Sequence, residues 1–169
     1  MAINLQFVYG AGNDDWYGGG LRELRYKMNK LFGSKIYSPD ILDYTEYARI
    51  KARVASWGDP TILVGHSCGD NPITYLPNDL PSKKFPFVFG IAPSIYCPVS
   101  SLGSNVQRAC QATSWWGDFF NPGGRTLMSW KSGKSMDVIA TGLGHVPAPY
   151  SPAVSARLMK EVQLALEGK

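Results

Sequence analysis

The first apolar residues of the chain alternate with polar ones. Ile3, Leu5 and Phe7 are separated by Asn4 and Gln6, which predicts a short β-strand with one face against the core. Further along, apolar residues follow one another without interruption, as in strands of a parallel sheet covered by helices on both faces. We expect these further strands at 61–64 and 87–91, with others at 35–37, within 106–116 and at 138–140.

Apolar residues recur at helical spacing, three or four positions apart, in three other stretches. The second of these stretches opens with Asp43 and Glu46, which have the spacing of a capping box. A fourth and shorter helix, after residue 69, is expected to stop at Pro77, because proline lacks the N–H that a helix interior needs. The three longer helices are expected at 21–31, 43–57 and 152–167.

Strands that alternate with helices predict a three-layer α/β/α sandwich with a mostly parallel sheet of about six strands. A chain of 169 residues suffices for one such domain. The sheet and its helices use almost the whole chain, so we expect a single domain over 1–169 without a lid or cap. In sheets of this kind, ligands bind at the carboxyl ends of the strands. Functional side chains are therefore expected at that edge.

Composition narrows the classes of function. Hydrophobic residues make up 44% of the chain and charged residues 18%, which is typical of a compact globule and excludes a disordered chain. The net charge of +4 comes without any run of five like charges, so nucleic-acid binding is not expected. There is no long apolar stretch and no signal-peptide pattern at the start. We therefore expect a cytoplasmic protein without a membrane span.

Cysteine and histidine are both scarce. The three cysteines, Cys68, Cys97 and Cys110, do not form a disulfide scaffold, so reduced thiols are expected, and a bridge between Cys97 and Cys110 is left open. Metal-ligand spacing is missing from the sequence, and we expect neither a metal nor a cofactor. The two histidines, His66 and His145, are the candidates for acid–base chemistry near neutral pH.

Residues 65–69 read Gly-His-Ser-Cys-Gly and fit the motif G-x-S-x-G. They follow the predicted strand 61–64 and open a helix, which is the setting of a nucleophile elbow. In an elbow, a sharp turn presents the central side chain at the carboxyl edge of the sheet, so Ser67 is the candidate nucleophile. Cys68 is expected to point away from the reaction. The alternative interpretation of the motif is a plain glycine-rich turn.

A serine hydroxyl needs a base to take its proton. His66 is adjacent to Ser67 and its side chain is expected to point elsewhere, which leaves His145, directly after the strand 138–140. A carboxylate must then orient the imidazole, and Asp118 fits this role because it follows a strand at the carboxyl edge. The other carboxylates after the motif are less well placed; they are Asp70, Asp79, Asp137, Glu161 and Glu167.

The oxyanion of an acyl-transfer intermediate needs backbone N–H donors. One expected donor is the amide of Cys68, the residue after the candidate nucleophile. The other is the amide of Ala11, between Gly10 and Gly12 in the loop after the first strand. The aromatic residues beside Asp118 either line an acyl pocket or form core or a dimer contact; they are Trp115, Trp116, Phe119 and Phe120.

Over nearly its whole length, this arrangement resembles the α/β-hydrolase superfamily. The order Ser67, Asp118, His145 matches that family, and the proportions of the chain are similar to small cap-less bacterial lipases and cutinase-like esterases. The resemblance implies hydrolysis of carboxylic esters through an acyl-enzyme. Ser67 would be the nucleophile, His145 the base and then the acid, Asp118 its orienting partner, and the amides of Ala11 and Cys68 the oxyanion hole.

The chain departs from the family at Tyr9, where many members have a histidine, and at 70–72, where small residues are common. Other functions that fit the same residues are those of a thioesterase, an amidase or a cell-wall ester hydrolase. A non-catalytic binding module on the same fold is a further alternative. The expected partner is a small-molecule ester, and the sequence does not predict the oligomeric state.

Overall fold

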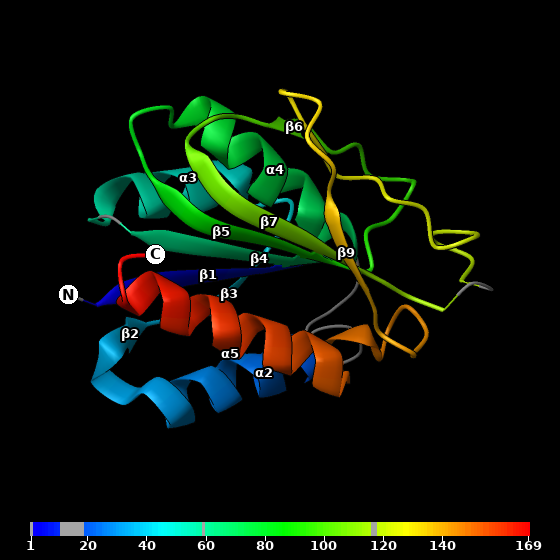
Figure 1. Ribbon diagram of the computed structural model, residues 1–169, viewed down its shortest axis with the longest axis horizontal. Coiled ribbons are helices and arrows are strands. Elements are labelled where there is room, and N and C mark those ends of the chain that lie inside the picture. Colours follow the sequence, from blue (N-terminus) through cyan, green and yellow to red (C-terminus); the bar gives the residue numbers. More distant parts are fainter. Residues whose placement is uncertain (1, 11–18, 59, 116–117) are drawn as a thin grey trace.

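The computed structural model describes residues 2–10, 19–58, 60–115 and 118–169. Their main feature is a sheet in which all pairings between the described strands are parallel (Figure 1). The short strand β3 (Ile41–Asp43) pairs with β1 beside the main path of the sheet. Along that path the strands follow in the order β2 (Ile36–Tyr37), β1 (Ile3–Tyr9), β4 (Thr61–His66), β5 (Phe85–Ile91), β7 (Val106–Thr113) and β9 (Asp137–Ala140).

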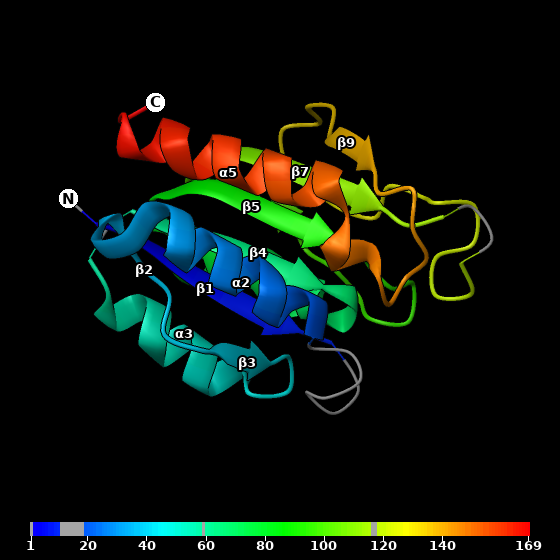
Figure 2. The same ribbon diagram turned by 90° about the horizontal axis from the view of Figure 1, so that it is seen from below.

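Helices cover both faces of this sheet. Helices α2 (Gly19–Phe32) and α5 (Pro152–Leu166) lie on one face, as Figure 2 shows from below. Helices α3 (Tyr47–Ser56) and α4 (Asp70–Asp79) lie on the other. The predicted three-layer α/β/α sandwich with a parallel sheet is therefore confirmed. None of the described helices is long and apolar enough to cross a bilayer.

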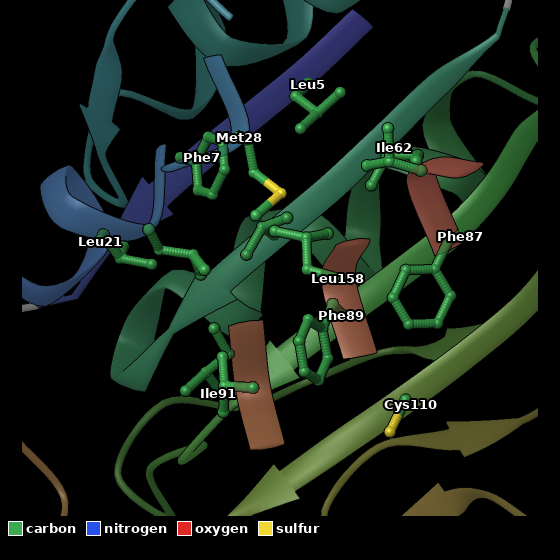
Figure 3. Close-up of a cluster of buried hydrophobic side chains, with 14 of the residues drawn as sticks. Leu5, Phe7, Leu21, Met28, Ile62, Phe87, Phe89, Ile91, Cys110 and Leu158 are labelled. Atoms are coloured by element: carbon green, nitrogen blue, oxygen red, sulfur yellow. The ribbon is translucent and has the colours of Figure 1, made fainter. Parts of the chain in front are cut away.

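The central strands alternate their side chains between two hydrophobic cores. Phe87 and Phe89 of β5 pack in the core under α2 and α5 (Figure 3). Val88, between them, packs in the core under α3 and α4. All three side chains are completely buried. Burial of one such side chain stabilises the fold by about 1.5–3 kcal/mol, so these strands are held firmly along their length. The carboxyl ends of β4 and β5 are thereby fixed relative to each other.

The helix α4 corrects one expectation from the sequence. It does not stop at Pro77 but runs from Asp70 to Asp79, and the Leu80 N–H still donates to the carbonyl of Leu76 at 2.9 Å. Pro77 stands close to the helix end and is itself buried, so the hydrogen bond that it removes is offset by packing. The loss of one N–H therefore does not end the helix.

The helix α3 begins later than predicted, at Tyr47, and only one half of the predicted capping box forms, the bond from Asp43 to Glu46. The backbone N–H of Asp43 donates to Oε2 of Glu46 at 3.1 Å, and the N–H of Thr45 donates to Oδ1 of Asp43 at 2.8 Å. Both donors lie in the turn before the helix, so these bonds do not pair the first N–H groups of α3 itself. The predicted cap thus organises the turn in front of the helix.

Small elements complete the described fold. A separate parallel pair joins β6 (Ser101–Leu102) to β8 (Ser129–Trp130), and each of these strands is too short to leave a periodic signal in the sequence. This pair ties the segment after β5 to the segment after β7. Three short 3₁₀ helices are Gly33–Lys35, Ser67–Gly69 and Ala148–Tyr150.

Candidate active site

The G-x-S-x-G motif forms a sharp turn at the carboxyl end of β4. The strand ends at His66, a 3₁₀ turn follows at Ser67–Gly69, and α4 begins at the next residue. Ser67 has a φ of 59°, in the left-handed region that residues other than glycine rarely adopt. Strain of this kind is characteristic of nucleophile elbows, where it presents the central side chain above the sheet. The local geometry of Ser67 is thus that of a candidate nucleophile.

Two glycines allow the elbow to pack directly against β1. A Cβ added at Gly69 would lie 2.2 Å from the carbonyl oxygen of Val8. A Cβ at Gly10 would lie 2.6 Å from the amide nitrogen of Cys68 and 2.8 Å from Cβ of Ser67. A side chain at either position would push the elbow away from β1. From the sequence, Gly10 was equally consistent with an ordinary turn, whereas the structure places it against the amide of Cys68.

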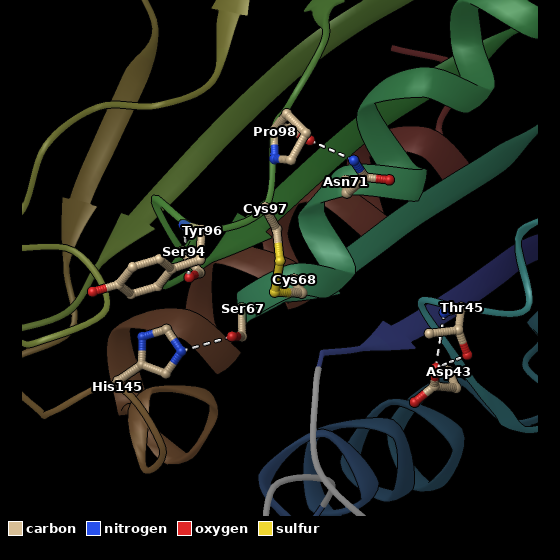
Figure 4. The surroundings of a disulfide bond; sticks show 10 residues. All are labelled: Asp43, Thr45, Ser67, Cys68, Asn71, Ser94, Tyr96, Cys97, Pro98 and His145. Carbon is tan, nitrogen blue, oxygen red and sulfur yellow. Dashed lines mark hydrogen bonds between the residues drawn. A yellow bond between two sulfur atoms is a disulfide. The ribbon is translucent and has the colours of Figure 1, made fainter.

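Three side chains that lie far apart in the chain form one hydrogen-bonded series. Nε2 of His145 is 2.8 Å from Oγ of Ser67 (Figure 4). Nδ1 of the same ring is 2.9 Å from Oδ2 of Asp118. An ionised carboxylate only accepts, so Nδ1–H donates to Asp118 and Nε2 is left to accept the hydroxyl proton of Ser67. The structure therefore brings together the three side chains that the sequence singled out.

The carboxylate of Asp118 is held by further donors from its own loop. The backbone N–H of Phe120 donates to Oδ1 at 2.8 Å, and the hydroxyl of Ser114 donates to Oδ2. Asp118 is buried, as are both partners in the series. Because its two oxygens are bound from different directions, the carboxylate has one orientation, and the imidazole of His145 is aligned by it.

The imidazole of His145 has its pKa lowered from 6.5 by burial. The negative charge of Asp118 and its hydrogen bond act in the opposite direction and offset part of this effect. The pKa of His145 consequently lies below its usual value, so the ring is neutral at pH 7. A neutral ring with a free lone pair on Nε2 is what a general base requires.

His66 has a role that the sequence did not reveal. Its side chain is completely buried, and its Nε2–H donates to the backbone carbonyl of His145 at 2.9 Å. Burial lowers the pKa of His66 to about 4, which keeps this ring neutral. The side chain thus supports the loop that carries His145, and it does not contact the hydroxyl of Ser67 within hydrogen-bond distance. Scarcity of histidine was the one signal in the sequence that pointed to this residue.

The cysteines are paired differently from the expectation. Cys68 and Cys97 form a disulfide, with Cα atoms 5.2 Å apart, and Cys110 is free and buried in β7. The expectation of reduced thiols is therefore wrong for Cys68 and Cys97, and the bridge that the sequence left open, Cys97 with Cys110, does not form. The reason is that the segment after β5 folds back over the elbow and brings Cys97 to Cys68 (Figure 4). Since its sulfur is bonded, Cys68 has no thiol that could act as a nucleophile.

Of the two backbone amides expected to form the oxyanion hole, the described residues include one. The backbone amide of Cys68 lies at the elbow, beside Gly10. Ala11 lies outside the described residues, as do Gly12 and Trp116. Of the other aromatic residues near Asp118, Trp115 and Phe119 are exposed, while Phe120 stacks on His145; these positions do not belong to the hydrophobic core.

The other carboxylates after the motif lie in different surroundings. Asp79 pairs with Lys51, and Asp137 pairs with Arg157. Asp70 is completely buried at the start of α4, and burial raises its pKa well above the usual value, against a smaller opposing effect of the Ile91 backbone N–H. Among the residues that the structure describes, no group of three or more His, Cys, Asp or Glu side chains is arranged to hold a metal ion.

No model of a known protein family matches this sequence, and no curated protein is similar to it at a significant level. Several solved structures, however, have a similar fold. The pyrethroid hydrolase PytH has a TM-score of 0.65 at 12% identity, over 96% of this chain and 98% of that one. The type II thioesterase BorB from the borrelidin biosynthetic cluster has a TM-score of 0.61 at 11% identity, over 96% and 93%.

A third structure of the same kind is the alpha/beta hydrolase domain-containing protein 10 from mouse, with a TM-score of 0.56 at 14% identity, over 98% of this chain and 90% of that one. At such low identities, the likeness concerns the path of the backbone and not the chemistry of the site. The match over almost the whole chain agrees with the parallel sheet and the elbow after β4. The chain has the fold of the α/β-hydrolase superfamily.

Proposed function

We propose that the protein is a serine hydrolase that cleaves carboxylic esters through an acyl-enzyme. The observation that carries this proposal is the series Ser67–His145–Asp118, with distances of 2.8 and 2.9 Å, at a strained turn on the carboxyl edge of the sheet. A buried hydroxyl, imidazole and carboxylate in this order supply a nucleophile, a base and an orienting charge. The expected partner is a small-molecule ester.

Acylation begins when Oγ of Ser67 attacks the ester carbonyl carbon while its proton passes to Nε2 of His145. The amide of Cys68, with the predicted amide of Ala11, stabilises the oxyanion of the tetrahedral intermediate. The carbon–oxygen bond to the alcohol then breaks, and His145 returns the proton to the leaving oxygen. The products of this half-reaction are a free alcohol and an ester of Ser67.

Deacylation repeats these steps with water. His145 takes a proton from the water molecule, and the oxygen attacks the acyl carbon. Collapse of the second intermediate returns the proton to Oγ of Ser67 and releases the carboxylic acid. Asp118 stabilises the imidazolium that forms in both halves, while His66 holds the backbone of His145 in place.

The structural neighbours support hydrolytic chemistry, since one is a pyrethroid hydrolase and another a type II thioesterase. A thioesterase with the same three residues is the second candidate, because a thioester carbonyl reacts by the same steps. The single domain without a lid stays a prediction. It implies that dissolved short-chain esters are hydrolysed without a lipid interface.

The test is covalent labelling of Ser67. A fluorophosphonate probe is expected to modify the native protein at Ser67 and to leave Ser67→Ala unmodified, as seen by peptide mass spectrometry. Hydrolysis of p-nitrophenyl acetate and of acetyl-thiocholine then separates esterase from thioesterase activity. A native protein that neither reacts with the probe nor hydrolyses either compound would be a binding module on this fold, and the proposal would be wrong.

The disulfide bears on where such an enzyme works. Disulfides persist in oxidising compartments and are rare in the cytosol. The bond between Cys68 and Cys97 therefore speaks against the cytoplasmic location that the sequence alone suggested.

A further inference from the structure

An exposed aromatic cluster lies beside the candidate catalytic histidine. Tyr96, Phe119 and Phe120 are in mutual contact, with ring centroids 5.7 to 6.5 Å apart, and we call them the aromatic rim. The side chains of Tyr96 and Phe119 are 59% and 72% exposed. Phe120 stacks on the imidazole of His145 at 4.4 Å between centroids. A contiguous apolar surface of this kind next to a reactive group marks a binding surface.

The rim is attached to the catalytic groups by its backbone. The N–H of Ile95 donates to the carbonyl of Phe120 at 2.9 Å, which joins the segment after β5 to the segment after β7. The Phe120 N–H in turn donates to Asp118, the carboxylate that orients the imidazole. Displacement of Phe120 would therefore also disturb the partner of His145.

The disulfide ties the other side of the rim to the elbow. Tyr96 directly precedes Cys97, and Cys97 is bonded to Cys68, the neighbour of Ser67 (Figure 4). The N–H of Tyr96 also donates to Oγ of the buried Ser94 at 3.3 Å. The aromatic ring of Tyr96 is thus carried by a segment that is covalently fixed to the nucleophile turn.

The proton path decides which part of an ester lies against the rim. His145 has to deliver its proton from Nε2 to the leaving oxygen, so that oxygen comes within about 3 Å of the imidazole. The carbonyl oxygen is directed to the amide of Cys68 and does not occupy this space. The group attached to the leaving oxygen therefore starts at the imidazole, whose face is covered by Phe120, and continues onto Tyr96 and Phe119.

We propose that the aromatic rim of Tyr96, Phe119 and Phe120 binds an apolar alcohol part of the ester, and that the disulfide of Cys68 with Cys97 holds the rim in register with Ser67. This inference rests on the proposed function. It assigns specificity to the leaving group, because Phe120 of the rim stacks on the imidazole that donates the proton. Each methylene of the alcohol that the rim covers raises kcat/KM by up to about fourfold.

The test compares two series of esters by pH-stat titration. One series consists of acetates of ethanol, butanol and hexanol, and the other of ethyl esters of acetic, butyric and hexanoic acid. In the native protein, kcat/KM is expected to rise with the length of the alcohol. In Phe119→Ser, the ratio of kcat/KM on hexyl acetate to that on ethyl acetate is expected to fall about tenfold.

The matched control is Tyr26→Ser on α2. Tyr26 is 65% exposed, similar to Tyr96, but it lies on a helix that covers the sheet and not at the candidate site. Its ratio for the two acetates is expected to equal that of the native protein. Tyr96→Ser, by contrast, is expected to lower the ratio as Phe119→Ser does.

Three outcomes would overturn the inference. If Phe119→Ser lost the dependence of kcat/KM on the length of the acid, and kept its dependence on the length of the alcohol, the acyl group would lie on the rim. An unchanged ratio, together with a native dimer that Phe119→Ser converts to a monomer in light scattering, would make the rim an interface between copies of the chain. Failure of the native protein to react with a fluorophosphonate at Ser67 would refute the proposed function itself, which the ester series alone does not do.

Discussion

The middle of the sheet and its carboxyl edge bury very different groups. In the middle, β4 and β5 place apolar side chains such as Val64 and Phe89 between the sheet and the helices α2 and α5. At the edge, only a few residues further on, the same strands lead into a region that buries two imidazoles and the carboxyl groups of Asp70 and Asp118. The middle of the sheet stabilises the fold, whereas the edge is costly to desolvate and carries the candidate chemistry.

Removal of the base is expected to have the largest effect on the edge. His145→Ala should lower kcat/KM on p-nitrophenyl acetate by about 10⁴-fold, because Ser67 then has no group that accepts its proton. Cooperative unfolding should persist, since the ring is not part of either hydrophobic core. The measurement is steady-state kinetics with a thermal melt on the same sample. Activity within tenfold of native would exclude His145 from the mechanism.

A substitution in the middle of the sheet should lower stability and leave the chemistry of the edge intact. Phe89→Ala removes a completely buried ring and is expected to lower the free energy of unfolding by about 3–5 kcal/mol. Below the unfolding transition, the remaining folded protein should keep its reaction with a fluorophosphonate, since Ser67 and its partners are unchanged. Urea titration and probe labelling test this pair of effects. Complete loss of labelling in the folded variant would show that the core and the site are not separable.

The disulfide links the edge to the segment after β5, and its loss should be nearly as costly. The bond closes a loop with a sequence separation of 29 residues, so Cys97→Ser is expected to lower the free energy of unfolding by about 3–4 kcal/mol. Its control is Cys110→Ala, which removes a free thiol. Alkylation in denaturant without a reductant should modify Cys110 alone. Modification of all three cysteines under these conditions would show that the bond does not form.

The stability of the edge should also depend on pH through His66. Its pKa is 6.5 in an unfolded chain and about 4 when buried, so the unfolded state binds more protons between these values. The free energy of unfolding should therefore fall by about 3 kcal/mol as the pH drops from 6.5 to below 4. The fall in the free energy of unfolding over this pH range should be smaller in His66→Asn than in the native protein. Urea titration at each pH measures it. If the free energy of unfolding depended on pH equally in both proteins, His66 would not be the source of this dependence.

The smallest expected effect concerns Asp70, beneath the elbow. Burial raises its pKa, so its contribution to stability is greatest below the unfolded value of 3.8 and declines as the pH rises. Asp70→Asn removes this titration and is expected to stabilise the protein by about 1–2 kcal/mol at pH 8, with little effect at pH 4. Thermal melts at the two pH values measure the difference. A variant less stable than the native protein at pH 8 would mean that Asp70 is charged and bound.

Most elements of the fold followed from local patterns. The alternation at 3–7 predicted β1, and the uninterrupted runs predicted β4 and β5, because spacing along the chain determines which side chains share a face. Pro77 does not end α4 as the sequence predicts, because the cost of a proline depends on how close it stands to the helix end and how well it packs. The pair β6 and β8 left no pattern, because strands of two residues are too short to show one.

Part of the candidate site could also be predicted from local patterns in the sequence. Ser67 could be predicted from the motif. His145 and Asp118 could be predicted from their positions after strands, because parallel strands bring such positions to one edge of the sheet. The hydrogen bond from His66 to the backbone of His145 and the disulfide of Cys97 with Cys68 could not be predicted from the sequence. Both depend on the path of loops, and the direction of a loop is not encoded in hydrophobic spacing.

The sequence by itself determined the order of strands and helices, the position of the elbow and the residue types that could perform hydrolysis. Those properties are local, since they depend on neighbours within a few positions. Only the tertiary structure decided that Cys68 bonds to Cys97, that His66 supports His145, and that Tyr96 lies beside Phe119. Such contacts join positions tens of residues apart, and they form only when packing of the whole chain brings the loops together.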